Sequence, residues 1–119
     1  MKTNLDFISL QVKELESSAR FYTTILGLEE TEEKRPDAVV FKDDAGAIFA
    51  IRKPLFEIMK GMSLGVGVSM WFNIDNLDGT FKRVKKANAT IISPPVDGPF
   101  GRMFIIQDPD GYTLTFHQI

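Results

Sequence analysis

The chain has 119 residues, 44% hydrophobic and 25% charged, so we expect one compact domain with a hydrophobic core and not a disordered segment. Fourteen basic and 16 acidic residues give a formal charge of -2, which offers no broad attraction for a phosphate backbone, and we expect no nucleic-acid partner. Zero cysteines exclude disulfides and thiolate metal sites, and the single histidine, His117, excludes any site that needs two imidazoles from one chain.

No segment has the pattern of a signal peptide or a membrane span. Asp6 lies near the start, before any long apolar run, and the most hydrophobic stretch, residues 64–72, is short and contains Gly65 and Gly67. We therefore expect a cytoplasmic protein with no membrane partner.

The first half of the chain predicts a strand, a helix and a hairpin. Apolar residues alternate over 8–12, which predicts a half-buried strand, and recur with helical spacing over 15–25, after which Gly27 provides a stop. Segments 39–41 and 48–51 are rich in β-branched and aromatic residues, and the Asp-Asp-Ala-Gly turn between them predicts a hairpin.

The second half has the same order of elements. Residues 70–74 alternate and residues 81–87 have helical spacing, while 103–107 and 112–118 predict two strands around an Asp-Pro-Asp-Gly turn at 108–111. A less regular strand is expected after each helix, at about 29–33 and 89–93. Each half then has the order βαβββ.

The two halves are an internal repeat. Residues 7–16 align with 69–78 at a spacing of 62, and residues 43–51 align with 108–116 at a spacing of 65. The three extra residues fit a longer loop at 94–101. We predict an α+β fold with two βαβββ modules, at about 1–53 and 68–119.

Residues 54–67 join the modules and carry four apolar side chains, Phe56, Ile58, Met59 and Met62. Two interpretations remain open. The segment forms a helical turn or lid over a pocket, or it is a linker that packs its apolar groups on the nearest surface, which is the interpretation we favour.

Two motifs carry a family resemblance. Residues 15–28, Leu-Glu-Ser-Ser-Ala-Arg-Phe-Tyr-Thr-Thr-Ile-Leu-Gly-Leu, and residues 108–112, Asp-Pro-Asp-Gly-Tyr, closely resemble the vicinal oxygen chelate superfamily of glyoxalase I, bleomycin-resistance proteins and extradiol dioxygenases. The resemblance covers nearly the whole chain. It implies that each module curls into an open mixed sheet, that two such sheets enclose a ligand cavity within one chain or across a dimer, and that the protein is a homodimer.

The resemblance also places four metal-ligand positions, at Phe7, Ala50, Ser69 and Thr115. None is a normal metal ligand, because a catalytic divalent site needs two or three imidazole or carboxylate donors. We therefore expect no metal and no other cofactor, and no catalytic residue is identified.

Alternation extends these positions to one face of each sheet. The residues that share this face are Phe7, Ser9, Gln11, Ile48, Ala50, Arg52, Ser69, Trp71, Asn73, Thr113, Thr115 and His117. Nine of them are our candidate ligand-binding residues: Phe7, Ser9, Gln11, Arg52, Ser69, Trp71, Asn73, Thr115 and His117. The opposite face is apolar and is expected to pack against the helices: Ile8, Leu10, Val12, Met70, Phe72, Ile74, Leu114 and Phe116.

Four of the candidates have an alternative structural role. Trp71 stacks on a planar or cationic ligand, or is a core or dimer-contact residue. Phe7 lines the cavity, or only fills the space that a metal would occupy. His117 is an acid/base group, or an ordinary histidine near the chain end. Arg52 pairs with an anionic ligand, or lies solvated at a strand end.

Two charged stretches are assigned no chemistry. Residues 29–35 contain four glutamates, a lysine and an arginine, and are expected to form a solvated edge strand and loop. Four basic residues at 82–86 fit the polar side of a helix.

The leading hypothesis is a metal-free binding protein of the bleomycin-resistance type, which sequesters an aromatic drug or metabolite in a cavity of mixed polar and aromatic lining. The alternative is a divergent lyase, isomerase or dioxygenase-like enzyme of the same superfamily. A one-residue slip of the strands brings Ile8, Met70 and Leu114 inward and supplies no metal ligand either. The enzyme alternative therefore needs chemistry from His117, from acidic residues outside the usual positions, or from a partner subunit. The sequence does not identify the ligand.

Overall fold

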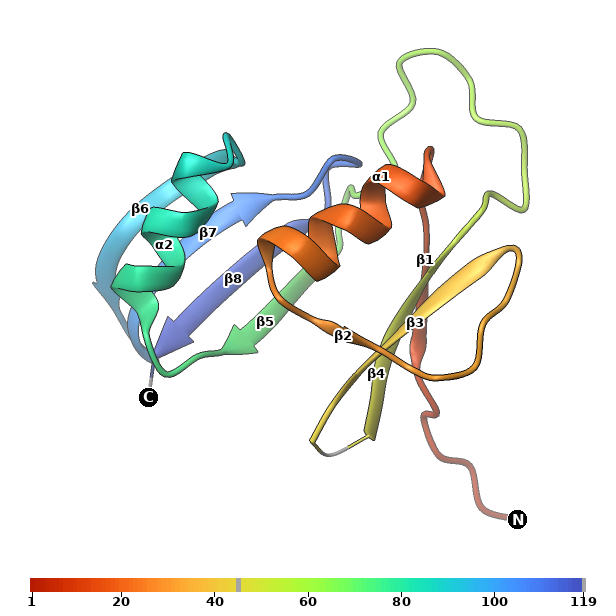
Figure 1. The fold of residues 1–119 in the computed structure, drawn as a ribbon, viewed down its shortest axis with the longest axis horizontal. Helices are drawn as coiled ribbons and strands as arrows, with labels where there is room; N and C mark the ends of the chain where they lie inside the picture. Colours follow the sequence, from red (N-terminus) through yellow and green to blue (C-terminus); the bar gives the residue numbers. More distant parts are fainter. Residues whose placement is uncertain (45, 119) are drawn as a thin grey trace. The chain divides into compact units, whose positions relative to one another are not determined.

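The computed structural model describes residues 1–44 and 46–118. The chain divides into two compact units, residues 1–60 and 61–119, and each is described by itself below. Each unit contains one four-stranded sheet (Figure 1). Within the described part of the chain, every helix is too short or too polar to cross a bilayer.

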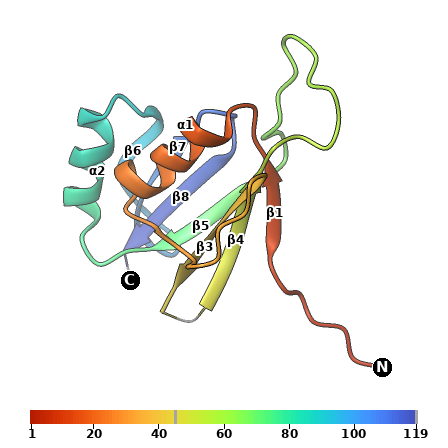
Figure 2. The same cartoon turned by 45° about the vertical axis from the view of Figure 1, so that its right-hand side comes forward.

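Unit 1 has the predicted order of strand, helix and three strands. Its elements are β1 (Ile8–Gln11), α1 (Leu15–Arg20), a π-helical turn η1 (Phe21–Ile25), β2 (Glu29–Glu30), β3 (Ala38–Asp43) and β4 (Gly46–Arg52). The strand order in the sheet is β1-β4-β3-β2, and β1 runs parallel to β4 while the other pairs are antiparallel. The β3–β4 hairpin lies beside β1 (Figure 2). Of the predicted turn between β3 and β4, Ala45 lies outside the described residues.

The helix predicted over 15–25 is α-helical only as far as Arg20. The next residues widen into η1, where the Leu26 amide donates to the Phe21 carbonyl. The Thr23 hydroxyl donates to the Ala19 carbonyl at 2.8 Å, which competes with regular helix bonding, and β-branched residues disfavour a continued α-helix here. Gly27 then ends the helix with φ 75°, as its conformational freedom allows.

One aromatic residue of η1 organises the core of unit 1. The fully buried Tyr22 lies 5.4 Å, centroid to centroid, from both Phe41 of β3 and Phe49 of β4. These two phenylalanines are themselves 5.1 Å apart. These contacts fix the helical segment to one face of the sheet. Among the described residues of unit 1, no other helix is present to cover the opposite face.

Unit 2 repeats the arrangement. Its elements are β5 (Ser69–Asn73), α2 (Leu77–Lys86), β6 (Thr90–Gly98), β7 (Gly101–Gln107) and β8 (Thr113–Gln118). The strand order β5-β8-β7-β6 matches unit 1 element by element, and β5 runs parallel to β8. The neighbouring pair Ile8 and Phe49 in unit 1 corresponds to the pair Met70 and Leu114 in unit 2. Met70 follows Ile8 by 62 residues and Leu114 follows Phe49 by 65, as in the sequence repeat. The predicted α+β fold with two βαβββ modules is confirmed.

A row of phenylalanine rings forms the core of unit 2. Phe72 stacks on Phe116 with centroids 5.2 Å apart, and Phe116 stacks on Phe104 at 4.9 Å. Phe104 then meets Phe81 of α2 edge to face at 5.3 Å. The helix α2 therefore covers this face of the sheet (Figure 1).

The predicted helix-facing set is buried with one clear exception. Leu10, Val12, Leu114 and Phe116 are buried, and Met70, Phe72 and Ile74 are half-buried. Ile8, expected to pack against the helix, is instead 50% exposed. It is the first residue of β1, an edge strand, so that no neighbouring strand covers its outer side.

The predicted turn at 108–111 is present, and one side chain organises it. The Asp108 carboxylate accepts the Asp110 and Tyr112 amides at 2.9 Å each, while Gly111 has φ 89°. This is an Asx-type turn in which the aspartate replaces backbone acceptors. The strand β8 follows directly.

The strand predicted at 89–93 extends further, and the loop expected at 94–101 is mostly strand. β6 continues through Pro94 and Pro95 to Gly98, with register shifts at Ile91/Ser93 and Ser93/Val96. Because β6 is the outermost strand of its sheet, proline needs to donate no ladder hydrogen bond on the open side. The loop expected at 94–101 is therefore wrong over residues 94–98.

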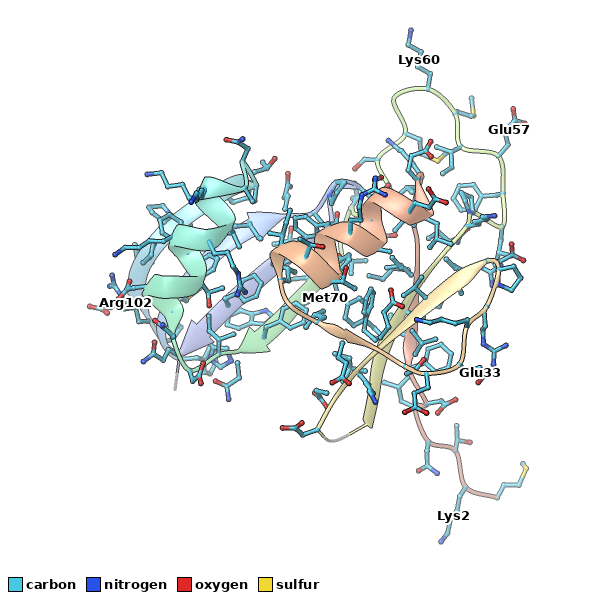
Figure 3. The ribbon with its side chains drawn as sticks, viewed as in Figure 1. Lys2, Glu33, Glu57, Lys60, Met70 and Arg102 are labelled. Carbon is cyan, nitrogen blue, oxygen red and sulfur yellow. The ribbon has the colours of Figure 1, made fainter. Side chains whose placement is uncertain are left out.

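Residues 54–67 contain neither a helix nor a strand. Ile58 and Met62 are half-buried, but Leu55, Phe56 and Met59 are exposed, so the expectation that the segment packs its apolar groups away holds only in part. Glu57 and Lys60 project from this segment away from the strands of unit 1 (Figure 3).

Candidate functional site

The face of the unit 1 sheet opposite the helix is hollowed into a cavity of about 620 Å³. Its lining residues are Asp6, Phe7, Ser9, Thr31, Glu33, Arg35, Ala38, Val40, Ala50 and Arg52. The strand registers explain this set, since Ser9 lies beside Ala50, Ala50 beside Val40, and side chains alternate along each strand. The structure thus brings together Phe7, Ser9 and Arg52 of our candidates around one hollow.

The cavity has an apolar floor and a charged rim. Arg35 pairs with Glu33 at 3.0 Å, so these two charges largely offset each other. Arg52 donates from Nε to the Lys53 carbonyl at 3.1 Å, and no carboxylate in the described residues forms an ion pair with it. The terminal nitrogens of Arg52 are therefore positioned to meet an acceptor group in the cavity.

Sequence reasoning missed the contribution of residues 29–35. The structure places Thr31, Glu33 and Arg35 on the cavity wall, because the Thr31 amide donates to the Val40 carbonyl at 2.9 Å and so continues the line of β2 along β3. The edge strand expected at 29–35 could have indicated this contribution, because residues that extend an edge strand also lie along the border of the sheet face.

Unit 2 carries an aromatic cluster, formed by Trp71, Phe100 and His117. Trp71 meets Phe100 edge to face with centroids 5.9 Å apart, and meets His117 at 5.7 Å with 76° between the ring planes. Trp71 is 49% exposed and Phe100 is exposed, so the rings gather without forming a core. Phe100 was not among the sequence candidates.

Strand alternation places two members of the aromatic cluster. Trp71 lies beside Thr115, and Asn73 beside His117, in the parallel pair of β5 and β8. Since Phe72 and Phe116 face the core, Trp71 and His117 are on the opposite face. This is the face assigned to them by the sequence.

The third member comes from the two-residue turn between β6 and β7. Gly101 follows Phe100 with φ 97°, and a Cβ added to it would lie 2.5 Å from the Gln118 carbonyl oxygen. Only glycine therefore allows the turn to approach the end of β8. Here His117 Nδ1 lies 3.1 Å from the Phe100 carbonyl oxygen.

The remaining candidates are placed elsewhere. Gln11 accepts the Leu55 amide at 2.6 Å, Asn73 lines a separate hollow of about 540 Å³ with Asp75 and Arg83, and Ser69 is exposed on β5. Thr115 shares the face of Trp71 but is only 2% exposed. Thr115 is therefore buried beneath its neighbours, and its hydroxyl is not accessible to a ligand.

The positions that carry the superfamily's metal do not fit one in this chain. Phe7 and Ala50 lie in unit 1 and provide no donor atom, and the hydroxyls of Ser69 and Thr115 in unit 2 are poor ligands for a divalent ion. Across residues 1–44 and 46–118, no group of three or more acidic or histidine side chains is arranged to hold a metal ion.

The chain is similar in sequence and in fold to several known proteins. The chain is 30% identical over 107 residues to the phenazine antibiotic resistance protein EhpR of Enterobacter agglomerans, which is 87% of this chain and 82% of that protein. A crystal structure of a protein of unknown function from Agrobacterium tumefaciens str. C58 matches with a TM-score of 0.82 at 21% identity, over 100% of this chain and 96% of that one. A glyoxalase/bleomycin resistance protein/dioxygenase family enzyme from Burkholderia phytofirmans PsJN matches at 0.78 and 16% identity, over 95% and 96%. The last two likenesses concern the fold alone.

Residues 4–116 match the family model of this same superfamily, nearly the whole chain. The resemblance drawn from the motifs at 15–28 and 108–112 is thereby confirmed. The chain belongs to the Glyoxalase/Bleomycin resistance protein/Dioxygenase superfamily.

Proposed function

We propose that this protein binds a planar aromatic small molecule without a metal and protects by sequestering it. The observation that carries the proposal is the aromatic cluster, because a half-exposed tryptophan with two further rings beside it offers a large apolar surface for stacking. The relative named for resistance to a phenazine antibiotic supports the same ligand class, since phenazines are planar heteroaromatic compounds.

The cavity of unit 1 supports the binding of amphipathic molecules. Its volume of about 620 Å³ lies within the range of pockets that hold drug-sized ligands, which is roughly 300–1,000 Å³. Phe7 and Ala50 provide apolar surface where a metal centre would need donors, and Arg52 provides one group that orients an acceptor on the ligand.

The same proposal includes a homodimer in the cytoplasm. Each unit has a sheet with two edge strands, and a second copy is the simplest partner that covers such edges symmetrically. A cytoplasmic location agrees with the absence of cysteine from the chain.

The test is direct titration of the purified protein with phenazine, measured by calorimetry and by the fluorescence of Trp71, the single tryptophan. We expect saturable binding with one defined stoichiometry, weakened in Trp71→Ala. Chemical conversion of phenazine on incubation with catalytic amounts of protein would favour the enzyme alternative. Absence of binding at ligand concentrations near the solubility limit would refute the proposal.

A further inference from the structure

The hydrogen bond of His117 determines which of its ring nitrogens carries the proton. The Phe100 carbonyl oxygen can only accept, so the 3.1 Å contact requires an N–H at Nδ1 of His117. In a neutral imidazole the other nitrogen, Nε2, is then an acceptor. Nε2 has no hydrogen-bond partner among the described residues, and His117 is half-buried.

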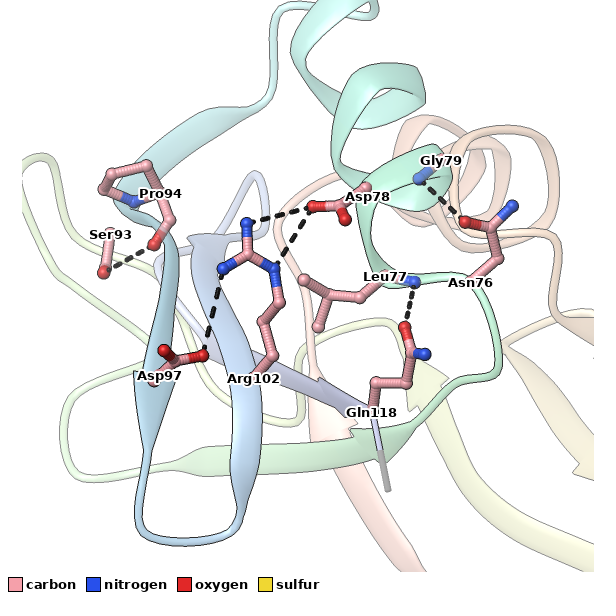
Figure 4. A network of polar contacts seen from close by, with 9 residues as sticks. All are labelled: Asn76, Leu77, Asp78, Gly79, Ser93, Pro94, Asp97, Arg102 and Gln118. Carbon is pink, nitrogen blue, oxygen red and sulfur yellow. Dashed lines mark hydrogen bonds and ion pairs between the residues drawn. The ribbon is translucent and has the colours of Figure 1, made fainter.

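The carbonyl that imposes this tautomer is itself held in place. Arg102, two residues after Phe100, contacts Asp78 of α2 at 3.2 Å and Asp97 of β6 at 4.0 Å (Figure 4). It thereby ties the hairpin between β6 and β7 to α2. The antiparallel pairing of β7 with β8, in which Arg102 lies opposite Gln118, holds the same hairpin against β8.

The acceptor adjoins the most exposed aromatic surface of unit 2. The His117 and Trp71 rings are 5.7 Å apart and steeply inclined to each other, and Trp71 is half-exposed, so a molecule that packs on the exposed part of Trp71 also lies close to the imidazole. We propose that the aromatic cluster selects planar aromatic ligands that carry a hydroxyl or N–H donor at the ring edge, and that His117 Nε2 accepts this hydrogen bond. The inference rests on the proposed function and specifies its ligand class.

The carbonyl of Phe100 rules out the opposite assignment in the neutral protein. If Nε2 carried the hydrogen, the lone pair of Nδ1 would face the lone pairs of a carbonyl oxygen at 3.1 Å. A ligand that offers only an acceptor at its edge would in turn face the lone pair of Nε2. Donor-bearing ligands are therefore favoured over ligands of the same size and shape without a donor.

The first experiment measures the tautomer. The ¹⁵N chemical shifts of the His117 ring at about pH 7.5, where ordinary imidazoles are mostly neutral, distinguish a protonated Nδ1 from a protonated Nε2. We expect a pyrrole-like Nδ1 and a pyridine-like Nε2. The reverse pattern overturns the inference whatever the protein binds.

The second experiment compares 2-hydroxyphenazine with 2-methoxyphenazine, which keeps the ring but lacks the donor. We expect wild-type protein to prefer the hydroxyl compound by about twofold to tenfold, the range for one hydrogen bond. His117→Phe keeps a ring beside Trp71 and should bind both compounds equally, while Lys86→Ala, on the exposed side of α2, should keep the preference. Equal affinities in wild type overturn the donor assignment but leave aromatic binding intact. Failure of both compounds to bind removes the proposed function and this inference together.

Discussion

Arg52 and His117 occupy the same position in the two repeats. Arg52 lies opposite Gln11 in the parallel pair of β1 and β4, and His117 lies opposite Asn73 in the parallel pair of β5 and β8. Each presents a nitrogen group on the face that has no helix of its own unit. One is a guanidinium, which can only donate, while the other is an imidazole, whose two ring nitrogens can donate or accept, so the two repeats share the position and differ in its chemistry.

The two faces of the unit 2 sheet should respond differently to truncation. We expect Trp71→Ala to lower affinity for an aromatic ligand by about 1–3 kcal/mol, the range for an aromatic anchor, with a folded protein. Because Trp71 is 49% exposed, its loss should cost only about 1–2 kcal/mol of unfolding free energy. Phe104→Ala, which empties a fully buried site, should cost roughly 3–5 kcal/mol.

Denaturant unfolding and calorimetric titration of both variants decide the matter. A Trp71→Ala protein as unstable as Phe104→Ala would make Trp71 a core residue. A Trp71→Ala protein that retains full affinity and full stability would mean that the aromatic cluster does not bind the ligand.

Strand alternation and the internal repeat predicted most of this fold, because alternation is a local pattern and the repeat gives the second half the same order of elements as the first. The register of Met70 with Leu114 follows directly from that of Ile8 with Phe49. Phe100 was not predicted as a site residue because its position depends on how far β6 extends, and the sequence predicts a loop at 94–101. The short π-helical turn also has no periodic signature, since it arises from the competition between Thr23 and the helix backbone.

For the candidate site, the sequence predicted which side of the sheet each side chain lies on, but not how exposed that side chain is. Alternation placed Thr115 on the same face as Trp71, which is correct, yet Thr115 is 2% exposed and Trp71 is 49% exposed. A period of two assigns a side chain to one side of a sheet, but its exposure depends on what neighbouring strands contribute. Thr31 and Arg35 reached the cavity of unit 1 for the same reason, through pairing that extends beyond β2.

Metal removal should have no effect on the purified protein. The four superfamily positions offer no imidazole or carboxylate, so we expect no stoichiometric Zn, Ni, Fe or Mn after dialysis and an unchanged melting temperature in chelator. Elemental analysis and thermal melts with and without EDTA measure this. About one metal per chain that survives dialysis would contradict it.

The Asp108 turn should be a strong determinant of stability. Asp108→Ala removes the acceptor of two backbone N–H groups in a buried turn, and we expect a loss of about 2–4 kcal/mol. Asp108→Asn retains a carbonyl oxygen of similar reach and should lose clearly less. Equal losses in the two variants would show that the charge of Asp108, and not its role as an acceptor, stabilises the turn.

The protein should be a homodimer in solution. Edge strands β1, β2, β5 and β6 leave backbone groups open, and exposed apolar side chains such as Ile8 and Ile92 lie on two of them. Sedimentation equilibrium at micromolar concentration should give twice the chain mass of 13.4 kDa. A monomer mass across the concentration range would overturn this prediction.

Gly101 should be needed for the aromatic cluster as well as for stability. In Gly101→Ala, an alanine must adopt a φ of 97°, and its Cβ would lie 2.5 Å from the Gln118 carbonyl oxygen. The turn must therefore move away from β8. Gly67→Ala is the matched control, since Gly67 has φ 81° but open space around its added Cβ. We expect the control to lose about 1 kcal/mol of unfolding free energy, from strain alone, and to keep the His117 tautomer. Gly101→Ala should lose more and should release His117 Nδ1 from the Phe100 carbonyl, so that the ¹⁵N shifts of the ring approach those of a free imidazole. If Gly101→Ala is as stable as Gly67→Ala and its His117 shifts match wild type, the hairpin does not hold the imidazole.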